Sequence, residues 1–267
     1  MTRHGRPDRP KKQRKDGATA ESAAARAAES LDADIARALR EPTSEEGLTT
    51  AAALGQGLMD GAVTVGWQGS KLRAACKEGC AYCCQGVRVA VTIAEVARAV
   101  DHARAYLEPE ALAHVEERAR DNAPRTHGAT ARGYPLRLAC ALLGDDGRCT
   151  VYAARPMMCR REHSLDVAQC KAGFDSDDPE RDSPIDHASR VMELGDATIS
   201  AFRRALSDAG TDAGYYELQE ALHLVLSTPG ILRAWLDGSD AFASARLDET
   251  VEDADARQDL VRLGVKP

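Results

Sequence analysis

The chain reads Cys76-Lys77-Glu78-Gly79-Cys80-Ala81-Tyr82-Cys83-Cys84 within its first third. Four cysteines therefore lie in nine residues, with gaps of three, two and zero residues between them. On a helix these positions would share one face, and in a loop the short gaps would let the backbone fold around one point. Either way, three or four sulfur atoms can converge within the ~2.3 Å that zinc or iron requires of a thiolate. We therefore predict that this stretch binds a metal ion or an iron–sulfur cluster.

All eight cysteines of the chain lie between residues 76 and 170. Cysteines with unrelated structural roles would be scattered, so the clustering itself supports a common site. Zinc commonly takes its ligands in two separated pairs, whereas three or more ligands from one loop are more typical of iron–sulfur clusters. The side chains of Cys83 and Cys84 would diverge in extended backbone, so one of them could serve a second centre. Eight thiols would suffice for two four-coordinate centres.

Charge is unevenly distributed along the chain. The 267 residues carry a formal net charge of −7, which argues against nucleic-acid binding by the chain as a whole. Residues 1–15 nevertheless hold seven Lys or Arg side chains against the single acid Asp8. No apolar segment follows them, so we interpret them as a disordered, solvated tail rather than a secretory signal. Contacts with RNA, DNA or an anionic membrane would be confined to this tail.

Hydropathy argues against a membrane-spanning segment. The longest largely apolar stretch, residues 51–67, is interrupted by glycines and by Asp60, and it falls short of the ~18–20 continuous apolar residues that a bilayer requires. We therefore expect a soluble, cytoplasmic protein. Because thiols usually stay reduced in the cytoplasm, clustered cysteines there indicate metal binding or catalysis rather than disulfides.

Composition favours helices. Only 4% of the residues are aromatic, while alanine, arginine and leucine recur throughout. We predict a mainly α protein, of the all-α or α+β class, with an irregular cysteine-rich metal-binding centre and a small β-hairpin. The expected organisation is a disordered basic tail (1–19), N-terminal helices (20–70), a cysteine-cluster metal-binding domain (71–175) and a C-terminal helical region (183–267).

Local patterns predict most of the helix ends. Thr92 and Glu95 match a capping box, and Ser183 with Pro184 would provide the N-cap and first residue of a helix that continues through Leu206. The N-terminal and central helices are expected over residues 20–40, 45–65, 93–107 and 109–120, followed by a loop from Asn122. Further helices are expected over residues 215–225, around Trp235, and over residues 247–260.

Two segments have the character of strands. Residues 86–91 alternate valines with other side chains and predict a short strand. Residues 136–152 predict a hairpin, because the turn-forming stretch Gly144-Asp145-Asp146-Gly147-Arg148 separates two apolar arms. Cys140 and Cys149 lie on opposite arms of that hairpin.

The downstream cysteines also carry a resemblance to a known family. Cys140, Cys149-Thr150-Val151-Tyr152 and Arg155-Pro156-x2-Cys159-Arg160 follow the motif Cys76-x3-Cys80-x2-Cys83-Cys84. Together these motifs resemble the YkgJ-type cysteine-cluster family, described as a zinc- or iron-chelating domain, over roughly residues 71–165. The resemblance implies metal chelation, with an iron–sulfur cluster (4Fe-4S) or zinc as cofactor and seven of the cysteines as ligands. Cys170 lies outside the matched motif, and we add it because of the clustering. The predicted ligands are Cys76, Cys80, Cys83, Cys84, Cys140, Cys149, Cys159 and Cys170.

Charged residues beside the motif offer further candidates. Arg155, Arg160 and Arg161 would place cations next to a thiolate-rich site, which lowers thiol pKa values, or would form surface salt bridges instead. His163 follows Cys159 by four residues and is a candidate ligand, although a histidine near a metal site is more often only a neighbour.

Three hypotheses follow for the function. The first is a metal-binding module whose iron or zinc serves structure, redox sensing or delivery. The second is an enzyme that uses S-adenosylmethionine, because Cys76-x3-Cys80-x2-Cys83 is also the radical-SAM spacing and because the family resembles flagellin lysine-N-methylase in its cysteine motif. Against a radical-SAM enzyme, no strand–helix alternation predicts a partial barrel. The third is an adaptor that binds nucleic acid or a protein partner through the basic tail.

Overall fold

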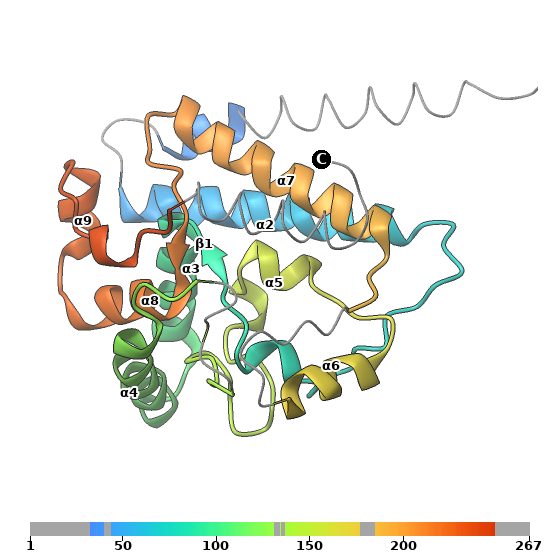
Figure 1. Cartoon of the computed structure of the whole chain (residues 1–267). Helices are drawn as coiled ribbons and strands as arrows, with labels where there is room; N and C mark the ends of the chain where they lie inside the picture. The colour runs from blue at the N-terminus through green and yellow to red at the C-terminus, as the bar shows by residue number, and fades with distance from the viewer. Residues whose placement is uncertain (1–32, 40–43, 131–133, 135–136, 177–184, 249–267) are drawn as a thin grey trace, which may run out of the picture.

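A computed structural model describes residues 33–39, 44–130, 134, 137–176 and 185–248. This part of the chain is mainly helical, as Figure 1 shows. Residues 33–38 are helical, and single 3₁₀ turns occur at η1 (Tyr82–Cys84), η2 (Tyr152–Ala154) and η3 (Ala243–Ala245). The further helices are α2 (Glu45–Trp67), α3 (Ile93–Tyr106), α4 (Pro109–Thr126), α5 (Met157–Arg161), α6 (Val167–Asp175), α7 (Ser189–Asp208), α8 (Leu218–Ser227) and α9 (Ile231–Leu236).

A two-stranded sheet joins the middle of the chain to its C-terminal part. Strand β1 (Ala90–Val91) pairs antiparallel with β2 (Tyr216–Glu217), so that Ala90 lies opposite Glu217. The predicted class, mainly α with a small antiparallel β element, is confirmed, and the strand expected over residues 86–91 forms at its last two residues. The described residues contain no parallel strand pair, so they lend no support to a radical-SAM barrel.

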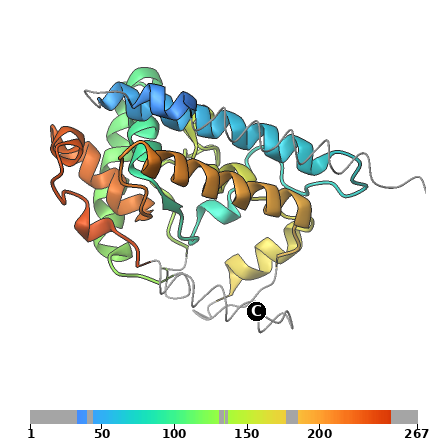
Figure 2. The same ribbon diagram turned by 90° about the horizontal axis from the view of Figure 1, so that it is seen from above.

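Helices α2 and α7 run side by side, which both ribbon views show (Figures 1 and 2). Phe202 of α7 is fully buried against α2, at Gly55. Helix α8 packs against α3 and α4. One hydrophobic cluster, which includes Leu48, Met59, Phe202 and Leu222, runs through these helices and forms the core behind the cysteine-bearing segments.

The start of α3 follows the predicted capping box. The hydroxyl of Thr92 accepts a hydrogen bond from the backbone N–H of Glu95, and the Glu95 carboxylate accepts one from the backbone N–H of Thr92 at 2.9 Å. The second carboxylate oxygen of Glu95 accepts the N–H of Met157 at 2.8 Å. The cap of α3 therefore also holds the start of α5, the helix that carries Cys159.

Helix α4 is longer than the sequence predicts. A loop was expected from Asn122, but the helix continues to Thr126 with Pro124 inside it. A proline so close to the end removes only one backbone hydrogen bond. Two side-chain hydrogen bonds offset this loss. The Thr126 hydroxyl donates to the Glu217 carboxylate at 2.8 Å, and the Asn122 amide donates to Gln219 at 2.9 Å. These buried contacts to α8 and β2 hold the last turn in place.

Two C-terminal helices begin later than predicted. Ser183 and Pro184 lie outside the described residues, and α7 begins only at Ser189. Residues 185–188 are not helical because their backbone bonds elsewhere: Leu165 donates to the Asp186 carbonyl at 2.8 Å, and Ala188 donates to the His163 ring. Helix α8 begins at Leu218 rather than residue 215, because β2 precedes it.

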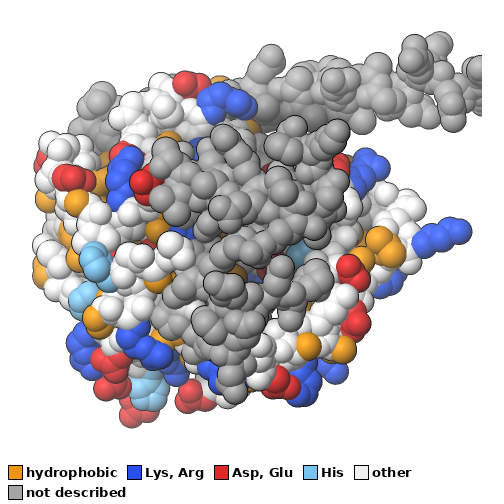
Figure 3. Space-filling view, viewed as in Figure 1, with side chains coloured by type: hydrophobic (Ala, Val, Ile, Leu, Met, Phe, Trp, Pro, Cys, Tyr) orange, Lys and Arg blue, Asp and Glu red, His pale blue; other side chains and the backbone are white. Residues whose placement is uncertain are grey.

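Some predicted segments cannot be followed in the structure. The basic tail (1–19) and most of the helices expected over 20–40 and 247–260 lie outside the described residues. The division of the chain into domains stays a prediction. Within the described part, no helix is long and apolar enough to cross a bilayer. Figure 3 shows side chains of both charges interspersed over the face formed by α4, as on a solvated surface.

The α2–α7 contact leads to a first prediction. A Cβ atom added at Gly55 would lie 2.5 Å from the ring of Phe202, whereas one added at Gly57 on the same helix meets nothing within 4 Å. We expect Gly55→Ala to lower the free energy of unfolding by about 1–3 kcal/mol through overpacking. The control Gly57→Ala should raise it by up to ~1 kcal/mol, because alanine favours helix. Urea denaturation measures both, and equal stabilities would contradict the close packing.

Candidate metal centre

The first four cysteines lie in a loop that ends in the 3₁₀ turn η1. Gly79, with φ of +79°, turns the backbone so that Cys80 donates to the carbonyl of Lys77 at 2.9 Å. At this turn the loop meets a second one, because a Cβ atom on Gly147 would lie only 3.1 Å from the Gly79 carbonyl oxygen. The first cysteine stretch is therefore a folded loop rather than a helix, and it lies against residues 144–149.

The second loop brings Cys140 and Cys149 together. It closes through backbone hydrogen bonds from Gly144 to Arg148 and from Thr150 to Leu142, both at 2.8 Å. The predicted hairpin thus forms a closed turn in its described part, with a single β-bridge and no strands. Burial raises the pKa of the Cys140 thiol to about 11, and the nearby Cys149 contributes in the same direction.

Backbone pairing joins the two loops. The N–H of Cys140 donates to the carbonyl of Cys84 at 2.8 Å, and the N–H of Gly86 donates to the carbonyl of Leu138 at 2.9 Å. An isolated antiparallel bridge between Gln85 and Ala139 lies between these two bonds. This pairing holds Cys84 next to Cys140, although 56 residues separate them in the chain.

Cys159 reaches the same place from α5. Burial raises its pKa well above the usual value, and the charges of Cys140, Cys149 and Cys83 raise it further. The pKa of Cys84 is also raised. Its hydrogen bond to Cys83 has the largest effect, and the charges of Cys140 and Cys159 add to it. That bond lowers the pKa of Cys83, because the Cys84 thiol donates to the Cys83 thiolate.

Cys76 and Cys170 lie in segments other than the 140–149 loop and α5. The backbone N–H of Ser164 donates to the Cys76 sulfur at 3.3 Å, and Ala75 donates to the Ser164 carbonyl at 2.7 Å. Partial burial raises the pKa of Cys76, and the charges of Cys80, Cys83 and Cys170 raise it further. Cys170 lies on α6, which Asp166 caps through the N–H of Ala168.

All eight cysteines lie in the described part of the chain, and all are free thiols. No three Cys, His, Asp or Glu side chains of the described residues converge closely enough to hold a single metal ion. The chemistry of the donor set nevertheless fits a metal, because soft thiolates are the ligands of zinc and of iron–sulfur clusters. The structure therefore brings the predicted ligands into one region, and their assignment as ligands stays a prediction.

Arg155 provides a second sign of fit. Its charge lowers the pKa values of Cys83, Cys149 and Cys159, and its guanidinium lies over the ring of Tyr152, with Cζ 4.1 Å from the ring centroid. The Arg155 Nε atom is buried and finds no hydrogen-bond partner among the described residues. A buried donor is seldom left unpaired, and a cation beside several thiolates offsets their charge. The unpaired buried donor and the positive charge of Arg155 therefore fit a thiolate-rich site.

A comparison with known protein families supports metal binding by this segment. The profile of the CxxCxxCC family, whose description is "Putative zinc- or iron-chelating domain", matches residues 75–180. The match covers less than half of the chain, and within it residues 75–180 are similar to that family. Metal binding is the activity that this description supports, and it names neither the metal nor a reaction. No curated protein and no solved structure matches the chain.

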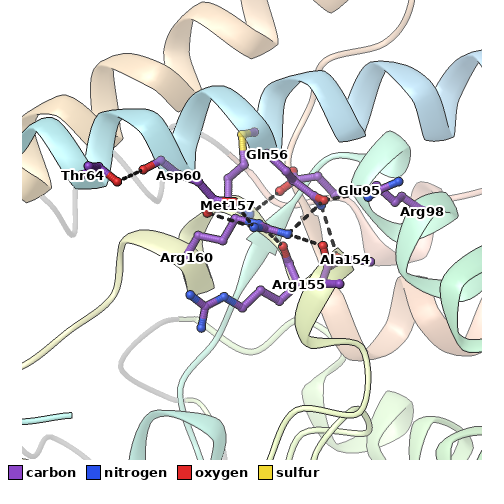
Figure 4. Close-up of polar contacts among 10 residues, drawn as sticks. Gln56, Asp60, Thr64, Glu95, Arg98, Ala154, Arg155, Met157 and Arg160 are labelled. Atoms are coloured by element: carbon purple, nitrogen blue, oxygen red, sulfur yellow. Dashed lines mark hydrogen bonds and ion pairs between the residues drawn. The ribbon is translucent and has the colours of Figure 1, made fainter. Parts of the chain in front are cut away.

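The other two arginines of the matched segment attach helix α5 to α2 and α7. Arg160 is almost fully buried and bonds to both carboxylate oxygens of Asp60, to Gln56 Oε1 at 3.3 Å and to two backbone carbonyls (Figure 4). Arg161 pairs with Asp196 of α7 at 3.2 Å. Of the three predicted cations, Arg155 therefore acts most directly on the thiols, while Arg160 and Arg161 attach α5 to α2 and α7.

His163 is not positioned to bind a metal ion, because both of its ring nitrogens have backbone partners. Its Nδ1 lies 2.9 Å from the carbonyl oxygen of Arg161, and its Nε2 accepts the N–H of Ala188 at 2.8 Å. With Nδ1 donating and Nε2 accepting, both ring nitrogens of the neutral imidazole are occupied. The ring therefore ties the end of α5 to the start of α7, and the alternative of a neighbouring histidine is the one that the geometry supports.

Sequence reasoning missed two groups that contact the cysteines. Gln219 of α8 donates from Nε2 to the Cys140 sulfur at 3.3 Å, and its Oε1 accepts the N–H of Ala141 at 2.8 Å. The backbone N–H of Ser164 makes the corresponding contact to Cys76. Gln219 lies in a helix distant in sequence and has no motif around it, so only tertiary packing reveals it. Such donors orient thiolates and tune bound metals.

The contacts of Arg160 lead to a second prediction. Lysine keeps the charge but lacks the planar set of donors, so Arg160→Lys cannot satisfy Asp60, Gln56 and the two backbone carbonyls together. We expect a loss of about 2 kcal/mol in the free energy of unfolding. Chemical denaturation of the full chain measures the change.

Arg120→Lys is the matched control. Arg120 pairs with Glu117 and Asp121 on the exposed face of α4, where ion pairs contribute roughly 0–1 kcal/mol. Equal effects of Arg160→Lys and Arg120→Lys on the free energy of unfolding would contradict the anchoring role of Arg160.

Proposed function

We propose that this protein is a metal-binding protein whose eight cysteines hold an iron–sulfur centre, and that the bound centre stabilises the fold of residues 76–170. One observation carries the proposal: segments far apart in the chain bring the free thiols into one region. The N–H of Cys140 donates to the carbonyl of Cys84, the N–H of Ser164 donates to the Cys76 sulfur, and α6, which carries Cys170, packs against the turn of Cys83 and Cys84. Thiols that merely filled a core would have no need to gather from four separate segments.

The arrangement supports iron–sulfur over zinc. A single zinc ion requires four donors within ~2.3 Å of one point. Cys76, Cys80, Cys83 and Cys84 come from one loop, and three or more ligands from one loop are more typical of iron–sulfur clusters. Gln219 donates a hydrogen bond to the Cys140 sulfur, and the charge of Arg155 lowers the pKa of Cys159; hydrogen bonds and charge of this kind tune iron–sulfur sites. Free thiols of this number also suit a reducing, cytoplasmic environment.

The decisive experiment is chemical analysis of the full chain purified without oxygen. We expect iron and acid-labile sulfide in equal amounts and a brown protein with charge-transfer absorption in the visible range. A colourless protein with zinc would replace the iron–sulfur assignment and keep metal binding. A folded protein without any metal would refute the proposed function.

Metal removal provides a further prediction. Because site formation and folding are coupled, chelation should increase hydrogen exchange in residues 76–170. Helix α8 serves as an internal reference, since its residues Leu218, Ala221 and Leu222 lie in the hydrophobic core and should stay protected. Unchanged exchange over residues 76–170 after complete metal loss would contradict a stabilising role for the metal.

A further inference from the structure

A hollow of about 430 Å³ lies beside the C-terminal half of α7, away from the cysteine-bearing segments. Its walls come from α7, from the loop that follows this helix and from Arg246 next to η3. Among the described residues that line it, three are arginines and only Asp212 is an acid. The lining side chains with hydroxyl or guanidinium groups are Ser200, Arg203, Arg204, Ser207, Thr211 and Arg246.

The hollow forms because the chain turns back at the end of α7. Gly210 has φ of +76°, its N–H donates to the Ser207 carbonyl, and the N–H of Thr211 donates to the Leu206 carbonyl, both at 2.9 Å. Residues 200, 203, 204 and 207 are spaced by three and four, so they share one face of the helix beside this turn. Because the turn already satisfies these last carbonyls of α7, the arginines are not needed to cap the helix.

Arg203 is held in place by its surroundings. Its Nε donates to the Ala213 carbonyl at 2.6 Å, and its Cζ lies 3.8 Å from the centroid of the Tyr215 ring. The guanidinium is therefore positioned by the loop that closes the hollow. A side chain that is fixed in advance loses less conformational entropy when a ligand binds.

The acid of the hollow is engaged in positioning Arg246. Oδ1 of Asp212 accepts the N–H of Gly214 at 2.7 Å, and Oδ2 accepts a hydrogen bond from Arg246 at 2.8 Å. The Arg246 guanidinium packs directly on the backbone of Gly214, since a Cβ atom there would lie 2.7 Å from one of its terminal nitrogens. Asp212 thus fixes the turn and one arginine, and it offsets one of the three positive charges that line the hollow.

Arg204 differs from the other two arginines. It is exposed, and it makes no hydrogen bond or ion pair with another of the described residues. The hydroxyls of Ser200 and Ser207, on the same face of α7, likewise bond to none of the described residues. The hollow therefore collects hydrogen-bond donors and positive charge without a matching acceptor, and an anion between the guanidinium groups would reduce their mutual repulsion.

We propose that this hollow binds the phosphate group of a small molecule, with Arg204 donating to the phosphate and Arg203 and Arg246 already in position beside it. A phosphate carries nearly two negative charges at neutral pH and has oxygen acceptors on several sides. It therefore suits several planar guanidinium groups better than a carboxylate does. The site lies outside residues 75–180 and is independent of the proposed metal binding.

A second hollow, of about 320 Å³, adjoins the first and shares Thr211 and Asp212 with it. Trp235 and Ser239 are among its other lining residues. It offers an aromatic ring and a hydroxyl to the organic part of a phosphate ester. Inorganic phosphate and a phosphate ester share the group that the arginines recognise, and binding measurements distinguish them.

The test is isothermal titration calorimetry of the full chain with inorganic phosphate. We expect saturable binding by the unmodified protein and about tenfold weaker binding by Arg204→Ala, because a charge-assisted hydrogen bond is lost. Arg204 is exposed and has no described partner, so its removal leaves the fold intact, which circular dichroism checks. Arg204→Lys keeps the charge without the planar donors, and it should recover part of the affinity.

Arg190→Ala is the matched control. Arg190 is also an exposed arginine of α7, but it does not line the hollow and lies about 21 Å from Arg204 along the helix axis. Both substitutions remove one positive charge and leave the cysteines unchanged, so phosphate bound to a metal would affect them equally. Arg190→Ala should bind phosphate as the unmodified protein does. Equal affinities of the two variants, or no saturable binding by the unmodified protein, would overturn the inference.

Phenyl phosphate, titrated in the same way, distinguishes the two sources of the phosphate group. Tighter binding than that of inorganic phosphate, weakened by Arg204→Ala, would support the site and identify an ester as its ligand. Equal or weaker binding that Arg204→Ala also weakens would support the site and identify inorganic phosphate. Binding of phenyl phosphate that Arg204→Ala leaves unchanged would count against the hollow as the binding site.

Discussion

The hydrogen bonds of Arg160 connect the long helix α2 to the segment that carries Cys159, and the arrangement of the cysteines depends on this connection. The guanidinium reaches Asp60 and Gln56 on one side and the carbonyls of Ala153 and Arg155 on the other. The cysteine loops are short and irregular, so they bury too little apolar surface to fix their own positions. Buried polar contacts to the helices therefore position them.

The same principle recurs around the site. Glu95 caps α3 and also holds the N–H of Met157, while Gln219 binds Cys140, Ala141 and Asn122 together. Burial raises the pKa of Glu95, so this carboxylate is retained at a cost that its backbone partners reduce. Burial raises the pKa of several thiols as well, and a metal cation would favour the thiolate forms that burial disfavours. Any metal bound by these thiols would be coupled to folding for this reason.

Several local structures could be predicted because they depend on neighbouring residues alone. The capping box of Thr92 and Glu95 formed as expected, since its hydrogen bonds span three residues. The turn at residues 144–148 closed as expected, but no strands flank it, because Cys140 pairs its backbone with Cys84 instead. The helix that was expected to start at Ser183 begins only at Ser189 in the described residues. The cause is again pairing with a distant segment, because residues 185–188 form hydrogen bonds with the 163–169 segment.

The sequence by itself determined the chemistry of the site. Eight cysteines within one part of the chain, at spacings typical of a CxxCxxCC domain, predict metal binding before any coordinates are known. Only the tertiary structure decided that Cys84 pairs with Cys140, which thiols are exposed, and that both ring nitrogens of His163 are occupied by backbone groups. Ligand identity is a property of single side chains, whereas proximity between Cys84 and Cys140 arises from backbone pairing and core packing across 56 residues.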